Sequence, residues 1–202
     1  RERQDFLTYS VKLINATDFP FVNIRTVEQA ETSKFNILNI IQDEVKLDIG
    51  QATEVGGRLA AMSLDYACHD LMQGKLDALV TNPINKKNIQ SDKFNFPGHT
   101  EYLTNKFGVE ESLMIMTCHD LHIGIMTNHL SLSQVPKVLD RELILRKLQV
   151  MDSSLKRDFG IRMPKIAVLA LNPHAGDRGL IGTEDDSIVA PAIREAFDNG
   201  IL

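Results

Sequence analysis

The sequence predicts an α/β fold with a mostly parallel sheet and some antiparallel pairing. Short apolar runs alternate along the chain with longer segments in which apolar residues recur at helical spacing. Two of the apolar runs are separated only by the polar stretch "CHDL", which favours one antiparallel pair. The sequence shows no internal repeat, low-complexity tract or linker, so nothing in it marks a domain boundary within residues 1–202.

The first predicted elements are a strand, a long helix and a second strand. Residues 35–41, "FNILNII", form a short apolar run typical of a buried strand. Residues 50–74 form a helical pattern that ends at Gly74, and its apolar positions are Val55, Leu59, Met62, Ala67 and Leu71. The run "DALVTN" at 77–82 ends before Pro83, and it is predicted to be the next strand.

The middle of the chain adds a helix and a hairpin. Pro97 and Gly98 interrupt the chain just before a segment with helical character, so a helix is predicted to follow them. The runs "SLMIMT" at 112–117 and "HIGIMT" at 122–127 are predicted to pair as closely joined strands.

The last third predicts helix, strand and helix. Asp140 is an N-cap candidate for a helix that continues to Gly160. The run "KIAVLAL" at 165–171 is β-branched and short, as expected for a buried strand. Residues 183–200 begin with acidic side chains, which a helix N-terminus favours, and Pro191 predicts either a kink or a later helix start.

Composition excludes several classes of partner. The formal net charge of -5 provides no basic field for nucleic acid or an anionic membrane, although a few local cations can still hold a small anionic substrate. Cys68 and Cys118 are far apart and form no CxxC pair, which disfavours a disulfide framework and a cysteine zinc site and favours a cytoplasmic location. No apolar run has membrane-spanning length and no signal peptide is visible.

Three histidines stand in positions where ligands bind in α/β proteins. His129 and His174 each follow an apolar run, and His99 stands at the start of a predicted helix. Imidazoles on two neighbouring strand tips could bind one metal ion, but histidines that only satisfy loop carbonyls would show the same spacing, and both interpretations stay open. The other three histidines are expected to be structural or solvated: His69, His119 and His122.

Two further stretches carry polar groups next to these positions. The stretch "VTNPINKKN" places Lys86 and Lys87, with Thr81 and Asn82, after a predicted strand, where a lysine can bind a phosphate or carboxylate or can simply be solvated. In "GHTEY", Thr100 beside His99 supplies a hydroxyl at a helix N-terminus, either for an anion or as an ordinary N-cap.

A glycine-rich loop surrounds the last of the three histidines. Gly176, Gly179 and Gly182 make a flexible stretch before the last predicted helix. Their spacing does not match GxGxxG, so the loop is not a dinucleotide-binding fingerprint.

Four blocks in order, "VTNPINK", "FPGHTEYL", "TNHLSL" and "LNPHAGDRGLIGTEDD", resemble the 4-hydroxythreonine-4-phosphate dehydrogenase (PdxA) family of vitamin B6 biosynthesis. The resemblance runs from about Ile40 to the end of the chain. It implies a three-layer α/β/α fold like that of isocitrate and isopropylmalate dehydrogenases, with this chain as the central portion of a two-subdomain enzyme. It also implies a homodimer with the active site near the subunit interface.

The resemblance assigns roles to five residues of this chain. It implies that His99 and Thr100 bind the substrate and that His129 and His174 are two of three metal-binding histidines. Lys86 matches the lysine of the family's "TGPVHK"-like block, and Lys86 and His99 are the implied catalytic residues. The cofactor-binding residues are not among the matched blocks.

The implied reaction is the oxidation of 4-phosphooxy-L-threonine with NAD, or with NADP, followed by decarboxylation to 3-amino-2-oxopropyl phosphate. A divalent metal ion would lower the pKa of the substrate hydroxyl group and polarise the ketone that forms. Histidine ligands suit zinc, cobalt or nickel better than magnesium, although the sequence does not choose the ion. The nicotinamide would accept the hydride, and the protein would position it.

Some of the family's features fall outside this chain. The third metal-binding histidine, in a "YHDQG"-like block, and the main cofactor-binding region would follow Leu202, and a "GDPxGIG"-like block would precede the chain. We therefore expect the natural polypeptide to extend in both directions. Asn82 replaces a small residue and Arg178 replaces a glycine, and either change could alter substrate preference.

Two alternatives accompany this interpretation. A related enzyme of the same superfamily would oxidise 4-phospho-D-threonate or 4-phospho-D-erythronate instead. A non-catalytic, metal-binding or dimer-forming scaffold would keep the fold without turnover.

Overall fold

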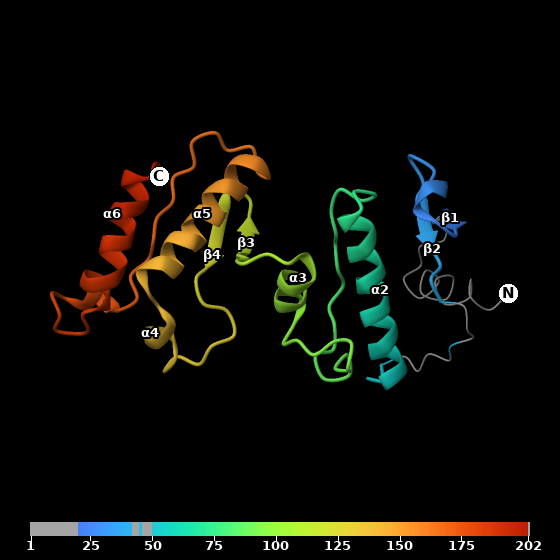
Figure 1. The fold of residues 1–202 in the computed structure, drawn as a ribbon, viewed down its shortest axis with the longest axis horizontal. Helices are drawn as coiled ribbons and strands as arrows, with labels where there is room; N and C mark the ends of the chain where they lie inside the picture. Colours follow the sequence, from blue (N-terminus) through green and yellow to red (C-terminus); the bar gives the residue numbers. More distant parts are fainter. Residues whose placement is uncertain (1–19, 42–44, 46–49, 202) are drawn as a thin grey trace. The chain divides into compact units, whose positions relative to one another are not determined.

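The computed structural model describes residues 20–41, 45 and 50–201. The chain divides into two compact units, Arg1–Lys106 and Phe107–Leu202. Among the described residues, each unit contains one two-stranded sheet together with helices, and the predicted α/β class is confirmed (Figure 1).

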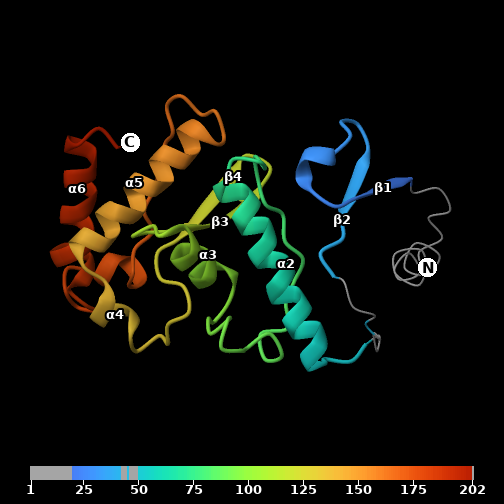
Figure 2. The ribbon, with the colours of Figure 1, turned by 45° about the vertical axis from the view of Figure 1, so that its right-hand side comes forward.

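The sheet of the first unit is a parallel pair. Strand β1 (Phe21–Ile24) pairs with β2 (Phe35–Leu38) in register from the first residue of each to the last. A short 3-10 turn at Val27–Gln29 lies between them, as Figure 2 shows. The strand predicted at 35–41 is confirmed over its first four residues, whereas β1 was not anticipated from the sequence.

The long helix α2 (Glu54–Met72) follows, close to the predicted limits. It begins where the Thr53 side chain accepts a hydrogen bond from the backbone N–H of Gly56 at 3.1 Å, an N-cap worth about 1 kcal/mol. It ends before Gly74, which takes the left-handed conformation predicted for a helix stop. Three of its four buried residues, Gly57, Leu64 and Cys68, share one face, and the fourth, Leu59, lies on the opposite side of the helix.

A close approach of two backbones places the segment that carries Lys86 against α2. A methyl group added at Gly57 would lie 1.9 Å from the carbonyl oxygen of Asn88, so only glycine allows this contact. The Asn88 side chain donates to the Thr53 carbonyl at 2.9 Å, and the next residue, Ile89, is almost completely buried. The start of α2 therefore fixes the position of the segment around Asn88, which also carries Lys86.

Two predicted strands do not join a sheet. Residues 77–82 and 165–171 run extended, but among the described residues neither has a ladder partner. A strand exists only with a hydrogen-bonded neighbour, and the apolar side chains of both segments are partly uncovered, with Val80 95% and Leu169 86% exposed. The prediction of strands at these two places, and of a mostly parallel sheet built on them, is wrong for the described chain.

The second unit begins with the predicted hairpin. Strands β3 (Met114–Cys118) and β4 (Leu121–Ile125) pair in antiparallel register, with a tight turn between them. Behind the hairpin, the nearly buried Lys147 donates from Nζ to the Ser112 carbonyl at 2.5 Å and pairs with Glu111 at 2.7 Å.

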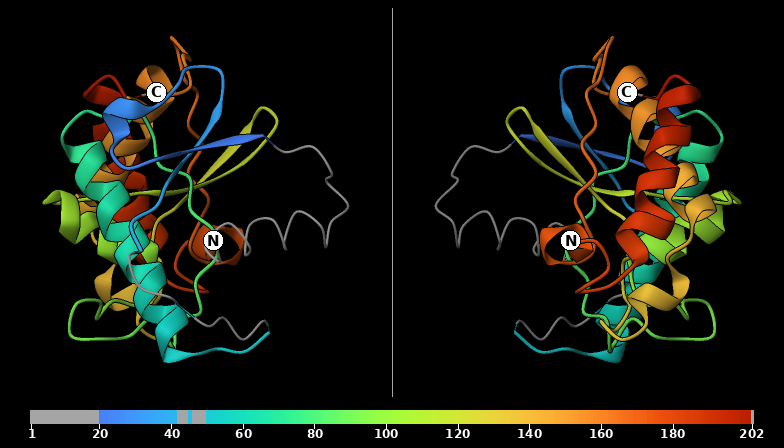
Figure 3. Two further views of the ribbon diagram at one scale, coloured as in Figure 1. Left: turned by 90° about the vertical axis from the view of Figure 1, so that its right-hand side faces the viewer. Right: turned by 90° about the vertical axis from the view of Figure 1, so that its left-hand side faces the viewer.

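Helices α5 (Arg141–Arg157) and α6 (Ala190–Asp198) pack side by side and form the core of the second unit (Figures 1 and 3). The predicted N-cap is confirmed, because the Asp140 side chain accepts from the backbone N–H of Leu143 at 2.7 Å. A single helical turn, α4 (Val135–Val138), precedes α5. The buried core residues are Leu139, Ile144, Leu148, Val189, Ala192, Ala196 and Ile201.

The last predicted helix is divided into two parts. Residues Asp185–Val189 form a π-helical turn, and α6 begins only at Ala190. Helical backbone runs without a break from Glu184 through the π turn into α6, and Pro191 is the second residue of α6. Of the two outcomes predicted from Pro191, the structure therefore shows an irregularity within the helical segment. Single π turns inside helices occur frequently at functional sites.

In the part of the chain that the structure describes, none of the helices combines the length and the apolar character that crossing a membrane requires.

Candidate functional site

In the first unit, Lys86 lies beside the start of helix α3 (His99–Phe107). A methyl group added at Gly98 would lie 3.7 Å from Cε and 4.0 Å from Nζ of Lys86. The exposed lysine and the half-buried His99 therefore come from different segments to one place. Because the helix begins at His99, Thr100 lies inside its first turn, where backbone N–H groups are free of helical partners.

An aromatic cluster anchors α3 behind these residues. The Tyr102 ring is stacked on Phe94, with centroids 4.9 Å apart, and meets Phe96 edge-on at 5.5 Å. The Tyr102 hydroxyl donates to Oδ1 of Asp65 on α2 at 3.0 Å, and Lys106 pairs with the same oxygen. These contacts fix α3 through its buried face, while at its N-terminus Gly98 is buried and His99 and Thr100 are half-buried.

The charges of this cluster are coupled. The Lys106 ammonium, together with the Tyr102 hydroxyl, holds the pKa of the Asp65 carboxyl below its ordinary value, against the smaller effect of burial. Burial and the hydrogen bond to Asp65 raise the pKa of the Tyr102 phenol. Tyr102 is therefore a neutral donor at physiological pH and Asp65 a charged acceptor.

The other two candidate histidines lie on loops of the second unit. His129 follows the hairpin strand β4, and His174 stands in the short turn Pro173–Gly176, after the extended segment 165–171. Both residues are exposed.

The backbone around His174 is left-handed over six successive residues. The φ angles are 54°, 52°, 79°, 45°, 56° and 92° for His174, Ala175, Gly176, Asp177, Arg178 and Gly179. A residue other than glycine in this region costs roughly 1–2 kcal/mol, so the turn needs support from outside. Such strain clusters at ligand-binding and catalytic sites.

Support for this turn comes from two acids that the sequence interpretation did not single out. Asp185 is 5% exposed and accepts three hydrogen bonds from Leu171 and Asn172, and Glu184 accepts a fourth from Asn172. The sequence interpretation assigned the acidic residues of this stretch to the helix dipole. The sequence signal for this support was Asn172, two residues before His174, together with the acid pair Glu184 and Asp185 after the glycine-rich loop.

His129 and His174 have side chains of a type that binds metal ions. Imidazole is a common ligand for zinc and other divalent transition ions. A catalytic zinc site usually has three protein ligands, and within the described ranges no three His, Cys, Asp or Glu side chains gather in a way that could hold an ion. The donor chemistry fits a divalent ion, and the described residues provide an incomplete ligand set.

The remaining histidines have other surroundings. His69 is exposed on α2 and His119 is exposed in the hairpin turn. His122 is half-buried on β4, and its ring lies against Phe159 with centroids 4.4 Å apart. None of these three belongs to the loops described above, and their structural or solvated roles stay predictions.

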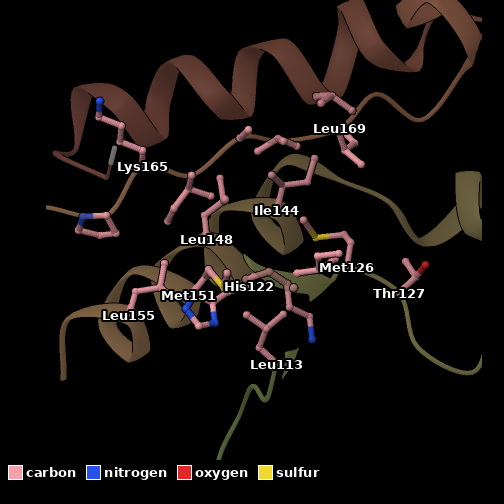
Figure 4. Close-up of a pocket in the computed structure, with 18 of the residues that line it drawn as sticks. Leu113, His122, Met126, Thr127, Ile144, Leu148, Met151, Leu155, Lys165 and Leu169 are labelled. Atoms are coloured by element: carbon pink, nitrogen blue, oxygen red, sulfur yellow. The ribbon is translucent and has the colours of Figure 1, made fainter. Parts of the chain in front are cut away.

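A cavity of about 720 Å³ in the second unit reaches Thr127 and Leu171, which come shortly before His129 and His174 in the chain. It lies between the hairpin, α5 and the extended segment 165–171, and Figure 4 shows Leu148, Met151 and Leu113 pointing into it. Its lining is mostly apolar, and neither His129 nor His174 contributes to it. The segment 165–171 forms one side of this cavity, and a few polar side chains, among them His122 and Lys147, also line it.

The α/β fold and the polar residues on these loops are typical of α/β enzymes. The polar candidates of this chain lie at a helix N-terminus, on the loop after the hairpin strand β4, and on the loop after the apolar segment 165–171. A sequence model of the family described as "Pyridoxal phosphate biosynthetic protein PdxA" matches residues 3–202. The chain belongs to this PdxA family.

Individual relatives agree with the family match. A 4-hydroxythreonine-4-phosphate dehydrogenase of Bacteroides thetaiotaomicron is 39% identical over 183 residues, which cover 90% of this chain and 50% of the relative. A Bradyrhizobium diazoefficiens protein, provisionally named D-threonate 4-phosphate dehydrogenase, is 37% identical over 146 residues, covering 72% of this chain and 42% of that protein. The chain thus spans about half the length of the curated relatives it matches.

A solved structure supports the same fold. The crystal structure of a 4-hydroxythreonine-4-phosphate dehydrogenase from Klebsiella pneumoniae matches with a TM-score of 0.81 at 29% identity. The match covers 96% of this chain and 59% of that one.

Proposed function

We propose that the protein containing this chain is an NAD-linked dehydrogenase that oxidises and decarboxylates 4-phosphooxy-L-threonine in vitamin B6 biosynthesis. The observation that carries the proposal is the family match over residues 3–202, in a chain that keeps a lysine and a histidine together at one helix N-terminus. The name of the Bacteroides relative supports the same substrate.

The proposed roles follow from the local settings. His99 and Thr100 bind the substrate at the start of α3, where free backbone N–H groups and the helix dipole favour a negative charge. Lys86 lies at the same end and adds a full positive charge for a phosphate or carboxylate. A second role for Lys86, proton transfer, is kept as the alternative.

The reaction balances as follows. The carbinol C–H bond of the substrate breaks, its hydride reduces NAD to NADH, and the hydroxyl proton leaves to a base, which produces a ketone β to the carboxylate. The bond to the carboxylate then breaks, carbon dioxide leaves, and the electron pair that remains takes up a proton to give 3-amino-2-oxopropyl phosphate. A divalent ion held by His129 and His174 with a ligand outside the described residues would, when bound, acidify the hydroxyl group.

We also propose the architecture and assembly that go with this activity. The complete protein would have a three-layer α/β/α fold and would act as a cytoplasmic homodimer with its active site near the subunit interface. Light scattering on the complete protein would measure a mass of two chains if this is correct, and a mass of one chain would contradict it.

The activity is tested by following NADH formation at 340 nm with the complete protein and 4-phosphooxy-L-threonine, with and without a chelator. Turnover that disappears with the chelator and returns with a divalent ion is expected. The matched competitors are 4-phospho-D-threonate and 4-phospho-D-erythronate, because one relative carries a D-threonate 4-phosphate name. Preference for a D-acid would keep the chemistry and change the substrate.

No turnover of any of the three compounds by folded protein would favour a non-catalytic scaffold. The role of Lys86 is separated by two variants, because arginine keeps the charge but does not readily lose a proton. Lys86→Arg should keep KM within a few-fold and Lys86→Ala should raise it if the lysine anchors an anion. A loss of kcat in both variants with little change in KM would favour proton transfer.

A further inference from the structure

The His174 turn has a buried acidic support whose geometry is specific. In Asp185, Oδ1 accepts the backbone N–H of Leu171 at 2.8 Å. Oδ2 accepts the backbone N–H of Asn172 at 2.9 Å and its side-chain Nδ2 at 3.0 Å. One carboxylate therefore binds the last two residues before Pro173, at the point where the extended chain becomes left-handed.

A second acid completes the support. The Asn172 amide also donates to Oε2 of Glu184 at 2.9 Å, so its side chain is held between two carboxylates. A methyl group added at Gly182 would lie 2.6 Å from Oε2 of Glu184 and 2.8 Å from Nδ2 of Asn172. Glycine at 182 is therefore the residue that leaves room for these hydrogen bonds.

The carboxylate is suited to this task by its charge. Burial raises the pKa of the Asp185 carboxyl, but the hydrogen bonds from Asn172 and Leu171 outweigh burial and the net pKa is lower than ordinary. Charge-assisted hydrogen bonds are stronger than neutral ones, and Asp185 also lies in the first turn of the closing helical segment, where the helix dipole favours an anion.

We propose that Asp185 is a positioning residue that sets the place of His174 by binding the backbone of Leu171 and Asn172, with Glu184 as its partner on the Asn172 side chain. This inference rests on the proposed function, because it takes His174 as a metal ligand. Asp185 touches neither metal nor substrate in this role. It acts through the backbone of Leu171 and Asn172, which places the His174 imidazole in position to bind the metal ion.

The test measures zinc affinity of the complete protein by competition with a chromophoric chelator, and hydrogen exchange of the Leu171 and Asn172 amides. Asp185→Asn keeps the shape but turns an NH₂ group toward donors. We expect faster exchange at both amides and a zinc Kd raised 10- to 100-fold, the range found when outer partners of metal ligands are removed. The control is Asp186→Asn, an exposed neighbour with the same charge change, which should stay within about twofold.

The possible results are distinguishable. If Asp185→Asn unfolds less cooperatively or exchanges faster, yet binds zinc within about twofold of the parent, Asp185 is only structural and the inference is overturned. If Asp185→Asn does not fold, Glu184→Gln replaces it, with a several-fold weaker zinc Kd expected and an unchanged Kd overturning the inference. His174→Ala tests the proposed function separately: if it binds zinc as the parent does, the ligand assignment fails, whatever Asp185→Asn does.

Discussion

His99 and His174 are held in place by two different kinds of interaction. His99 begins a regular helix that is anchored by an aromatic cluster and by the Tyr102–Asp65 hydrogen bond. His174 stands in a strained left-handed turn, and the buried Asp185 carboxylate holds the two residues that lead into that turn, Leu171 and Asn172. Packing fixes a helix as a rigid body, whereas an irregular turn needs hydrogen bonds to its own main chain.

The comparison indicates how each site should fail. A loss of packing should loosen the whole of α3, because the position of this helix depends on the packing of its one buried face. A loss of a buried acceptor should loosen only a few residues, because each hydrogen bond serves a single amide. Substitutions in the first unit should therefore have a global effect on its stability, and substitutions in the second unit a local one.

The largest effect is expected for Phe94→Ala. Phe94 is 1% exposed and stacked on Tyr102, so its removal should leave a cavity and lower the free energy of unfolding by about 3–5 kcal/mol. Urea unfolding of the complete protein measures this. Phe197→Ala, at a position 65% exposed, is the control and should change stability by less than about 0.5 kcal/mol. Equal effects of the two variants would contradict the packing account.

Gly182→Ala should have an intermediate and local effect of about 2–3 kcal/mol. Its φ of 141° is strained for alanine, and the added methyl group would press on Asn172 and Glu184. Hydrogen exchange should speed up at Asn172 and stay unchanged in α3. Gly200→Ala has a positive φ but nothing within 4 Å, so it should cost only about 1 kcal/mol. If Gly182→Ala and Gly200→Ala lower the free energy of unfolding equally, steric crowding at position 182 does not contribute to the loss.

Tyr102→Phe should cost about 1 kcal/mol. The substitution keeps the stacked ring and removes only the hydroxyl that donates to Asp65, which retains its pairing with Lys106. Differential unfolding against Tyr66→Phe, at a half-exposed position on the same helix as Asp65, provides the control. A loss as large as that of Phe94→Ala would mean that the hydrogen bond, rather than the ring, anchors α3.

The smallest effect is a pH dependence. Lys106 and then Tyr102 lower the pKa of Asp65 below its ordinary 3.8, so the carboxylate stabilises the fold at neutral pH and this contribution disappears as the pH falls through the lowered value. The stability difference between the parent and Asp65→Asn should be largest at neutral pH and shrink in acid. A difference that is the same at every pH would show that the charge of Asp65 is not what matters.

Much of the local structure was predictable, because helices carry their signals in nearby residues. The helical periodicity before Gly74 and the Asp140 N-cap predicted α2 and α5 closely, and Pro191 predicted an irregularity in the last helical segment. The hairpin was predictable for the same reason, since its two strands are neighbours in sequence.

Two strand predictions failed for a non-local reason. An apolar run such as 165–171 has the composition of a buried strand, but a strand forms only when another segment supplies hydrogen bonds along its edge. The candidate histidines could be singled out from their positions after apolar runs and from the family resemblance. The roles assigned to them, and the identity of a metal ion, stay predictions.

The sequence by itself determined the α/β class, the helix limits and the family, because periodicity, caps and ordered motifs are written in consecutive residues. Only the tertiary structure decided that Lys86 lies beside the start of α3 and that Asp185 holds the main chain before His174. The physical reason is that such contacts depend on where a loop returns in space. No local pattern records which amide a buried carboxylate will meet.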